Sequence, residues 1–389
     1  MLSSRMKNLH PYVPGEQPKD RAYIKLNANE NPYPPSPKVV KAVRDAAKAH
    51  PEKLALYPDP DSNELKEAIA DMLNKSGGVL CRANLEGGKQ NGSDALVSPS
   101  EFDKIPFVVT SDMIYAGNGS DEVLSFVFYA FFDSDRKLVL PEHTYSFYPV
   151  YGGFYNIPLE KIPLNSDWTL DTQKMLEAAH REDSGIIFAN PNAPTSLGLT
   201  RDEVREMLKK APRDKVFVVD EAYVDFGGES SIPLLAEFQN LVIVRTTSKS
   251  LCGAGQRLGY LVANKELVNA VTTVKNSLNH FPIDYLAQQA GIAACKDAGY
   301  YVKCAQSVAF ERDEFIDFLR EKGWSVLDSQ TNFVFCKKDG VNGEAAYKKI
   351  KESGILVRRF DTPGIEEYLR ITIGTHEQMQ ALREVMAEM

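Results

Sequence analysis

One lysine in this sequence has the neighbours that a catalytic amine needs. Lys249 lies in the stretch Arg245-Thr246-Thr247-Ser248-Lys249-Ser250, which directly follows the apolar run Leu241 to Val244. Such a run predicts a buried parallel strand, and open α/β sheets bind their ligands just past the carboxyl ends of strands. Arg257 follows eight positions later, and an amine beside an arginine-bound phosphate suits Schiff-base chemistry. Ser-Lys alone would indicate only a solvated loop lysine, so the other motifs must decide.

Two further apolar runs end in polar residues of chemical interest. One is followed by Asn190-Pro191-Asn192-Ala193-Pro194-Thr195 and the other by Asp220-Glu221-Ala222-Tyr223. Either acidic residue alone would be interpreted as a helix cap. Because the carboxyl ends of parallel strands meet at one edge of a sheet, the three polar ends together predict a single site.

A fourth motif has the composition of an anion-binding turn. The segment Gly117-Asn118-Gly119-Ser120-Asp121-Glu122 follows a short predicted strand, Met113 to Ala116, and opens a helix. Glycines allow close backbone approach, and free N–H groups at a helix N-terminus bind phosphate. Any capped helix after a tight turn has a similar pattern, so this motif gains weight only beside the others.

These motifs require a scaffold of alternating strands and helices. The expected strands are Leu138–Leu140, Ile186–Ala189, Val216–Val219, Leu241–Val244 and Leu258–Val262. Helical stretches separate them, and Thr200 with Glu203 has the spacing of a capping box. The alternation predicts an α/β domain of three layers, in which helices cover both faces of a mostly parallel sheet.

An N-terminal arm and a smaller domain are predicted around this sheet. Prolines and turn formers before residue 33 indicate an extended arm without regular structure, of a kind that crosses onto a partner subunit. Beyond Pro282, a long helical stretch with a break near Gly299 precedes short strands and further helices, which predicts an α+β domain. The polar stretch at about residues 77–110 is expected to be an irregular excursion. The predicted boundaries are 1–32 for the arm, 57–277 for the large domain, and 33–56 with 278–389 for the small domain.

Composition excludes several classes of protein. The chain has 45 basic and 53 acidic residues, a net charge of −8, which disfavours nucleic-acid and membrane-surface binding and indicates a small-molecule partner. Its five cysteines include no Cys-x-x-Cys pair, so neither disulfides nor a metal site is expected. Residues 1–15 lack the apolar core of a signal peptide, and we expect a cytoplasmic enzyme.

The order of the motifs resembles that of the fold-type I pyridoxal-phosphate-dependent aminotransferases. It comprises Gly-Ser-Asp-Glu from residue 119, Asn-Pro-Asn-x-Pro-Thr from 190, Asp-Glu-Ala-Tyr from 220, Ser-Lys from 248 and Gly-x-Arg-Leu-Gly-Tyr from 255. Pro-Tyr-x-Pro-Gly from residue 11, Asn-x-Asn-Glu-Asn-Pro from 27 and Tyr-Pro from 57 are most similar to the histidinol-phosphate aminotransferase branch. The resemblance covers nearly the whole chain except residues 77–110.

The resemblance implies pyridoxal 5'-phosphate as cofactor and assigns a role to each matching residue. An electron-sink ring needs a carboxylate at its nitrogen, a polar group near its hydroxyl and an amine that moves protons. By resemblance, the residues at the ring are Lys249, which bonds the cofactor, Asp220 at the ring nitrogen, Tyr223 at the ring hydroxyl and Tyr145 stacked on the ring. The phosphate ligands are Ser248, Arg257, the backbone amides of Ser120 and Asp121, and Tyr57 from the other subunit of a homodimer. Arg358 and Arg370 are the expected arginines for substrate anions.

The sequence departs from the family pattern in three places. Ala193 replaces an asparagine, so the amide at the ring hydroxyl is either lost or supplied by Asn192. Gln256 stands where a leucine is common, beside Arg257. The polar stretch at residues 77–110 has no counterpart and enters before the predicted phosphate turn.

The expected reaction interconverts histidinol phosphate and 2-oxoglutarate with imidazole-acetol phosphate and glutamate, a step of histidine biosynthesis. One alternative is an aminotransferase for aromatic or other amino acids, in which Arg370 binds an α-carboxylate. Another is a decarboxylase of a phosphorylated amino acid, because the same electron sink can break another bond at Cα. The acidic charge disfavours a non-enzymatic cofactor-binding regulator.

Overall fold

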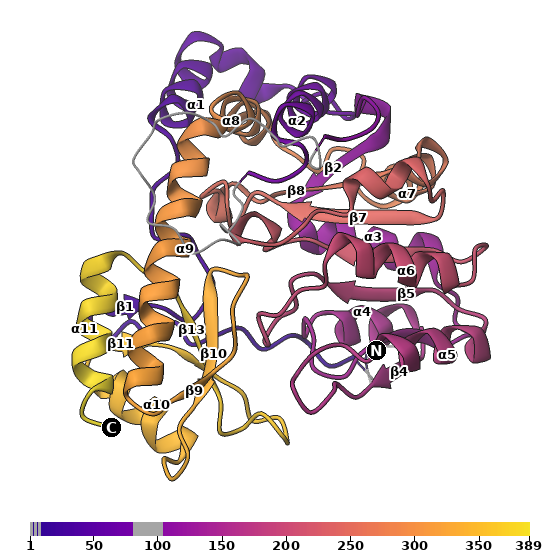
Figure 1. Ribbon diagram of the computed structural model, residues 1–389. Helices are drawn as coiled ribbons and strands as arrows, with labels where there is room; N and C mark the ends of the chain where they lie inside the picture. Colours follow the sequence, from indigo (N-terminus) through magenta and orange to yellow (C-terminus); the bar gives the residue numbers. More distant parts are fainter. Residues whose placement is uncertain (1–2, 4–5, 7–8, 81–103) are drawn as a thin grey trace.

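The computed structural model describes residues 3, 6, 9–80 and 104–389, and its main feature is a seven-stranded sheet (Figure 1). The order of the strands is β2-β8-β7-β6-β5-β3-β4. Their bounds are β2 Ile114–Asn118, β3 Leu138–Pro141, β4 Leu159–Ile162, β5 Ile186–Ala189, β6 Phe217–Asp220, β7 Leu241–Thr246 and β8 Leu258–Ala263. Among these described strands, β8 runs opposite to the other six, which are parallel to one another. The predicted mostly parallel sheet is therefore confirmed. The strand β4 was not predicted, because Leu159–Ile162 carries two charged residues in four positions.

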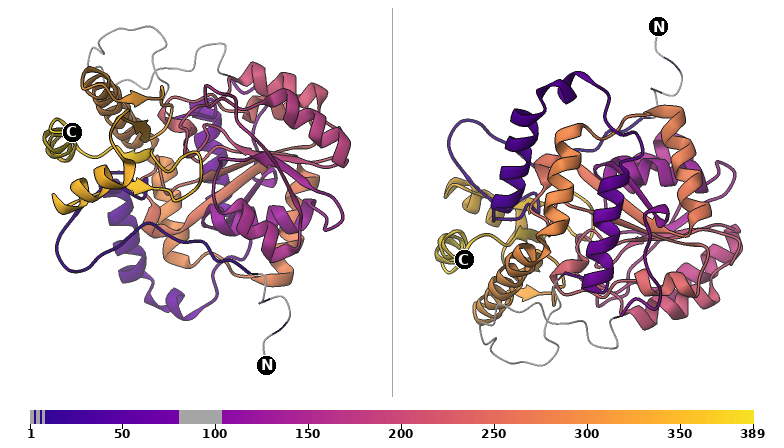
Figure 2. Two further views of the ribbon diagram at one scale, coloured as in Figure 1. Left: turned by 90° about the horizontal axis from the view of Figure 1, so that it is seen from below. Right: turned by 90° about the horizontal axis from the view of Figure 1, so that it is seen from above.

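Helices cover both faces of this sheet, as Figure 2 shows. Alternate strand residues such as Ile243 and Val244 belong to opposite cores, which follows from the two-residue repeat of a strand. One core packs under α2 (Asn63–Ser76), α5 (Thr172–Glu182), α6 (Arg201–Lys210) and α8 (Tyr285–Lys296). The other packs under α3 (Gly119–Phe131), α4 (Tyr148–Tyr155) and α7 (Lys265–Leu278). The expected three layers are therefore present.

A second, smaller sheet has the order β12-β13-β10-β9. Its strands are β9 Ser325–Val326, β10 Phe333–Lys337, β12 Arg358–Arg359 and β13 Leu369–Thr372. It packs with the helices α9 (Ala298–Glu321), α10 (Gly343–Glu352) and α11 (His376–Met386). In Figure 1, α9 runs from the end of the molecule that holds α8 down along this sheet. The helix break expected near Gly299 falls at Asp297, which ends α8 and precedes α9.

The N-terminal arm contains a strand that was not predicted. Ile24 and Lys25 form β1, parallel to β11 (Ile355–Leu356). Ile24 N donates to Gly354 O at 2.9 Å and Leu26 N donates to Leu356 O at 2.8 Å. The expectation of an arm without regular structure was therefore wrong for these residues, because the partner strand lies more than 300 positions away and gives no local signal.

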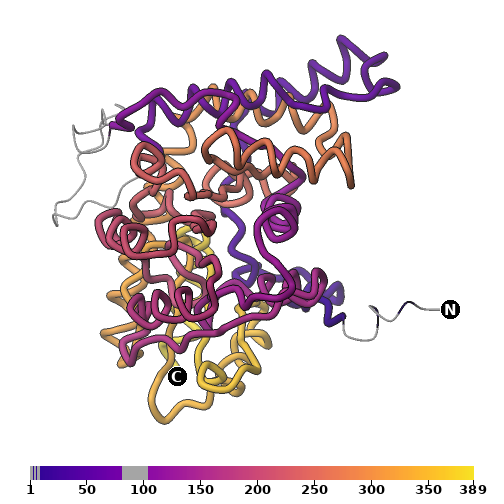
Figure 3. Tube along the Cα trace, turned by 90° about the vertical axis from the view of Figure 1, so that its right-hand side faces the viewer, coloured from indigo at the N-terminus to yellow at the C-terminus, as the bar shows by residue number. Residues whose placement is uncertain are grey.

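The helix α1 (Pro37–Ala49) follows the arm and packs against α8. Figure 3 shows α1 and α2 side by side with the orange helices of the C-terminal half. The proposed domain boundaries stay a prediction. The excursion at residues 77–110 lies mostly outside the described residues. No helix in the described part of the chain has the length and apolar character to cross a membrane, and no described cluster of His, Cys, Asp or Glu could hold a metal ion.

Candidate active site

Lys249 lies in the turn that follows β7, with its side chain directed into a cavity. Its Nζ is 3.4 Å from the carbonyl oxygen of Ala28 and 5.7 Å from the centre of the Tyr223 ring. Asn31 Nδ2 donates to the carbonyl oxygen of Lys249 at 3.0 Å. Residues of the arm thus hold the lysine on one side, and the end of β6 supplies Tyr223 on the other.

Asp220 is the last residue of β6 and is only 4% exposed. Tyr148 OH donates to its Oδ2 at 2.9 Å, and the backbone N–H of Ala222 donates to its Oδ1 at 3.1 Å. Burial raises the pKa of Asp220 to about 6, helped by the nearby carboxylates of Asp121 and Glu221 and opposed by the two hydrogen bonds. A carboxylate without a cationic partner in such a place favours a ligand that brings a positive charge.

The start of α3 forms a narrow turn against Arg257. Gly119 has a φ of +77°, and a Cβ at this position would lie 2.6 Å from Arg257 Nη2. A Cβ at Gly259 would lie 2.3 Å from the backbone nitrogen of Ser120, so both close approaches require glycine. Asp121 Oδ2 pairs with Arg257 Nη2 at 3.2 Å, and Tyr145 OH donates to Asp121 Oδ1 at 2.9 Å.

These groups line one cavity of ≈ 330 Å³. The predicted residues among its lining are Ser120, Asp121, Tyr145, Asp220, Tyr223, Ser248, Lys249 and Arg257. They supply helix N-terminal amides and a guanidinium for a phosphate, a phenol ring for stacking, a buried carboxylate and an amine. This set fits pyridoxal phosphate. Its phosphate needs amides and a guanidinium, its ring nitrogen needs a carboxylate, and its reactive carbon needs an amine.

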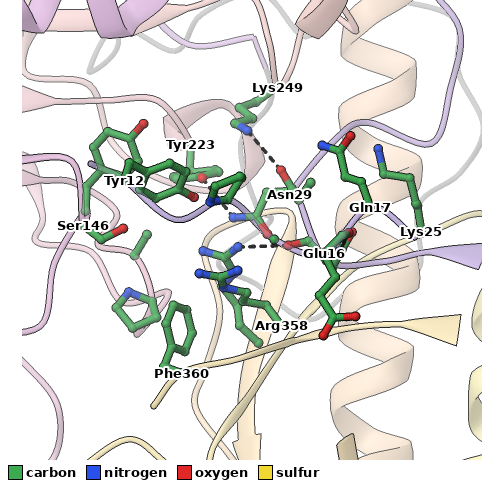
Figure 4. A pocket seen from close by; sticks show the side chains of 18 of the residues that line it. Tyr12, Glu16, Gln17, Lys25, Asn29, Ser146, Tyr223, Lys249, Arg358 and Phe360 are labelled. Carbon is green, nitrogen blue, oxygen red and sulfur yellow. Dashed lines mark hydrogen bonds between the residues drawn. The ribbon is translucent and has the colours of Figure 1, made fainter. Parts of the chain in front are cut away.

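A second cavity of ≈ 180 Å³ adjoins the first, with Lys249, Tyr145 and Tyr223 in both walls (Figure 4). It is also lined by arm residues from Tyr12 to Gln17 and by Arg358 and Arg370. Tyr12 packs against Phe147 with ring centres 5.0 Å apart. The arm of the chain therefore forms a wall of its own cavity.

Arg358 and Arg370 are directly opposite each other in the pair β12–β13. Arg358 Nη2 donates to the carbonyl oxygen of Val13 at 3.1 Å, and Arg370 Nη2 donates to that of Asn27 at 3.3 Å. Arg370 Nε is buried and has no hydrogen-bond partner in the part of the chain that the structure describes, and burial lowers the pKa of Arg370, with a smaller contribution from Arg358. Neither arginine makes an ion pair with a carboxylate of the described residues. Like charges at opposite strand positions are unfavourable, so the pair favours an anionic ligand.

Two predicted residues do not reach these cavities. The side chain of Asn192 hydrogen-bonds with Thr144 Oγ1, His143 O and Thr195 Oγ1, and Ala193 lines the cavities in its place. Tyr57 is 82% exposed and stacks on Phe281 at 4.4 Å. It lies outside both cavities of its own chain.

The sequence analysis missed two residues that support the site. Asn29 Nδ2 donates to Tyr223 OH at 2.9 Å, although Asn29 stands within one of the quoted opening motifs. Tyr148 binds Asp220 from α4, and only its position three residues after Tyr145 hinted at this role. The departure at Gln256 leaves its Oε1 buried without a hydrogen-bond partner among the described residues.

A comparison with known proteins identifies the class. The family model described as aminotransferase class I and II matches residues 21–386. The chain belongs to this family, so a pyridoxal-phosphate-dependent aminotransferase, the class that fold and site define, is confirmed.

Individual relatives and solved structures show which aminotransferases the chain is similar to. The chain is 43% identical over 385 residues to the histidinol-phosphate aminotransferase of Syntrophus aciditrophicus, covering 99% of this chain and 96% of that protein. It is 40% identical over 386 residues to the enzyme of the same name from Acinetobacter baumannii strain AYE, covering 99% and 96%. Among solved structures, it resembles histidinol-phosphate aminotransferase from Sinorhizobium meliloti in complex with pyridoxal-5'-phosphate, with a TM-score of 0.81, 22% identity and coverage of 100% and 96%. Aspartate aminotransferase from Thermus thermophilus with maleate gives a TM-score of 0.78 at 18% identity, covering 100% and 99%.

Proposed function

We propose that this chain transfers the amino group between histidinol phosphate and 2-oxoglutarate, giving imidazole-acetol phosphate and glutamate, in the biosynthesis of histidine. The observation that carries the proposal is the pair Arg358 and Arg370, two opposed cations on the wall of a cavity that contains Lys249, neither of which has an ion-pair partner among the described residues. Guanidinium groups make paired hydrogen bonds with phosphate and with carboxylate alike. The same pair can therefore bind a phosphate ester in one half-reaction and glutamate in the other. The named relatives at 40–43% identity support this choice of substrate.

The residues of the cofactor cavity divide the chemical work. Pyridoxal phosphate supplies an electron sink for the bond that breaks at the substrate Cα. Asp220 is buried where it can keep the ring nitrogen protonated, and Tyr148 holds the carboxylate in place. Lys249 Nζ would hold the cofactor, and once released from it the amine would carry the proton that leaves the substrate Cα to the cofactor. Tyr223 OH, which accepts a hydrogen bond from Asn29, would contact the ring hydroxyl.

The phosphate of the cofactor would be held by charge and by backbone amides. Ser248, Arg257 and the amides of Ser120 and Asp121 surround one end of the cavity. Arg257 is paired with Asp121, and a bound phosphate would compete with that carboxylate for the guanidinium. Tyr145 would stack on the ring, and the ring-hydroxyl contact proposed for Asn192 would require its amide to rotate away from Thr144.

The proposal includes a cytoplasmic homodimer with shared active sites. Although one face of its ring stacks on Phe281, Tyr57 is largely exposed next to the exposed side chains of Leu54 and Leu56, as expected of a residue that serves a neighbouring subunit. Lys249→Ala and Tyr57→Ala should each lose activity when purified alone. When the two variants are co-expressed, mixed dimers should regain activity, because one of their sites has both residues intact. No recovery, in a mixture shown to contain mixed dimers, would contradict shared sites.

Steady-state kinetics with a panel of substrates tests the choice of reaction. We expect the highest kcat/KM for histidinol phosphate with 2-oxoglutarate, well above phenylalanine, tyrosine and aspartate. Equal or higher values for aromatic amino acids would favour the general aminotransferase. Release of CO₂ without transfer of the amino group would favour a decarboxylase.

A further inference from the structure

A buried polar cluster lies beneath the turn that carries Lys249, and the proposed chemistry does not use it. Its members come from the segment that follows β6, from β7 and from the turn after β7. They are Glu221, Asp225, Ser230, Arg245 and Ser250, with exposed fractions of 1%, 9%, 0%, 3% and 2%. Burying one cation and two carboxylates costs desolvation free energy unless the charges are well paired and hydrogen-bonded. The presence of this cluster beneath the turn therefore needs an explanation.

Arg245 is the centre of this cluster. Its Nε pairs with Glu221 Oε2 at 2.9 Å, and its Nη1 lies 3.4 Å from Asp225 Oδ1. Its Nη2 donates to Ser230 Oγ at 3.1 Å. Glu221 is the neighbour of Asp220, so the guanidinium joins the strand that ends at the ring-nitrogen carboxylate to the strand that leads to Lys249.

Ser250 connects the cluster to the turn. Its Oγ donates to Asp225 Oδ2 at 2.6 Å. Ser250 is the residue after Lys249, and the N–H of Cys252 donates to the carbonyl oxygen of Lys249 at 3.4 Å. The side chain of Ser250 therefore fastens the turn from below, while the side chain of Lys249 points into the cavity.

We propose that Ser250 is a positioning residue for Lys249 and acts through Asp225 and Arg245. The inference rests on the proposed amino transfer. Lysine has a flexible four-carbon stem, so the place of its amine depends on how firmly its backbone is held. A displacement of about 1 Å in a reacting group can lower a rate by about 100-fold. A serine in this position thus acts on the chemical step without touching the substrate.

The test compares Ser250→Thr with Ser250→Val. The two side chains have the same shape, but only threonine keeps the hydroxyl that binds Asp225. Single-turnover conversion of the cofactor by glutamate, followed by absorbance, gives the rate of the chemical step and the Kd of glutamate separately. We expect the threonine variant to stay within about twofold of the wild type, and the valine variant to react about 10-fold more slowly with a Kd changed by less than about twofold.

Ser231→Ala is the matched control. Ser231 is 0% exposed and neighbours the same cluster, yet its Oγ has no hydrogen-bond partner among the described residues. Its loss should change neither the rate nor the Kd. Ser250→Ala provides a second measurement that does not depend on how the larger side chains fit, and it should react as slowly as Ser250→Val.

A double-mutant cycle tests the route through Asp225. If Ser250 acts through Asp225, then Ser250→Ala should have little further effect on the rate in an Asp225→Ala background, which lacks the acceptor for the Ser250 hydroxyl. Equal rates for Ser250→Val and Ser250→Thr, or strictly additive losses in the cycle, would overturn the inference while an active wild type leaves the proposed function intact. A wild type that glutamate does not convert would overturn the proposed function and the inference with it.

Discussion

The two adjoining cavities differ in how completely their polar groups are held by the protein. In the cofactor cavity, both oxygens of Asp220 accept hydrogen bonds from the protein, and Tyr223 OH accepts one from Asn29. In the second cavity, which we propose binds the substrate and call the substrate cavity, Arg370 Nε and Asn27 Oδ1 are buried without hydrogen-bond partners among the described residues. The substrate side thus has hydrogen-bonding capacity that a ligand can satisfy.

This difference separates the rigid part of the site from the part that selects the substrate. The groups that we propose to act on the cofactor lie at the ends of strands in the large sheet, where they can be preorganised before any substrate arrives. The arginines proposed for the substrate, Arg358 and Arg370, lie on the paired strands β12 and β13 of the small sheet. They face the arm, where the backbone carbonyl oxygens of Val13 and Asn27 accept hydrogen bonds from them. Changes to the first region should damage every substrate, whereas changes to the second should discriminate among substrates.

The most severe test of the cofactor side is Lys249→Ala. We expect a loss of about 10⁴-fold or more in kcat, because Lys249 is the only lysine among the described residues that line the first cavity and its amine is the proposed proton carrier at Cα. Borohydride reduction of the wild type should attach the cofactor to Lys249, as mass spectrometry of peptides would reveal. Lys25→Ala, which changes another lysine of the substrate cavity, should leave this attachment unchanged. Attachment at a different lysine would remove the basis of the assignment.

Asp220→Asn should separate activity from stability. We expect the loaded enzyme to lose about 100-fold or more in kcat, since an amide does not stabilise a protonated ring nitrogen. Turnover near that of the wild type would exclude the proposed role.

The same variant has a predictable effect on the cofactor-free protein. The folded pKa of Asp220 is raised to about 6, whereas an unfolded aspartate has a pKa of about 3.9. Folding therefore binds a proton more tightly, and this contribution to stability is present below about pH 4 and lost as the pH rises to about 6. Cofactor-free Asp220→Asn should be more stable than the wild type at pH 7 by on the order of 2 kcal/mol, and this advantage should vanish near pH 4. Denaturant unfolding at both pH values measures it.

Arg358→Ala sharpens the contrast on the substrate side. The kcat/KM for histidinol phosphate should fall by about 30-fold and that for phenylalanine by about threefold, because a dianion gains more from a second cation than a single carboxylate does. Arg359→Ala is the control, since Arg359 pairs with Asp361 at 2.5 Å outside the substrate cavity. Equal losses for both substrates would count against a phosphorylated substrate.

Arg370→Lys should have the smallest effect and the most even one. Lysine keeps the charge but loses the planar fork of donors, so we expect each half-reaction to weaken by about 10-fold. The absorbance of the lysine-bound cofactor should be unchanged, because Arg370 does not line the cofactor cavity. A shift of that absorbance would show that Arg370 acts on the cofactor rather than only on the substrate.

Local sequence predicted eight of the residues that line the first cavity. Asp220, Lys249 and the turn before Ser120 each stand directly after an apolar run, and parallel strands bring such ends together by their geometry alone. The sequence also determined the mostly parallel sheet, because a strand that is buried on both faces is a continuous apolar run. Motif and element are then adjacent in the chain, and a local pattern carries both.

Only the tertiary structure decided the features that depend on distant parts of the chain. The strand β1 exists because β11 lies beside it, and the arm reaches the cavity through a hydrogen bond between Val13 and Arg358. The sequence likewise contained no sign of the hydrogen-bond partners of Asn192 or of the hydrogen bond from Ser250 to Asp225. A side chain of Asn or Ser can bind many neighbours, and which neighbour it meets is set by packing between elements rather than by the residues beside it.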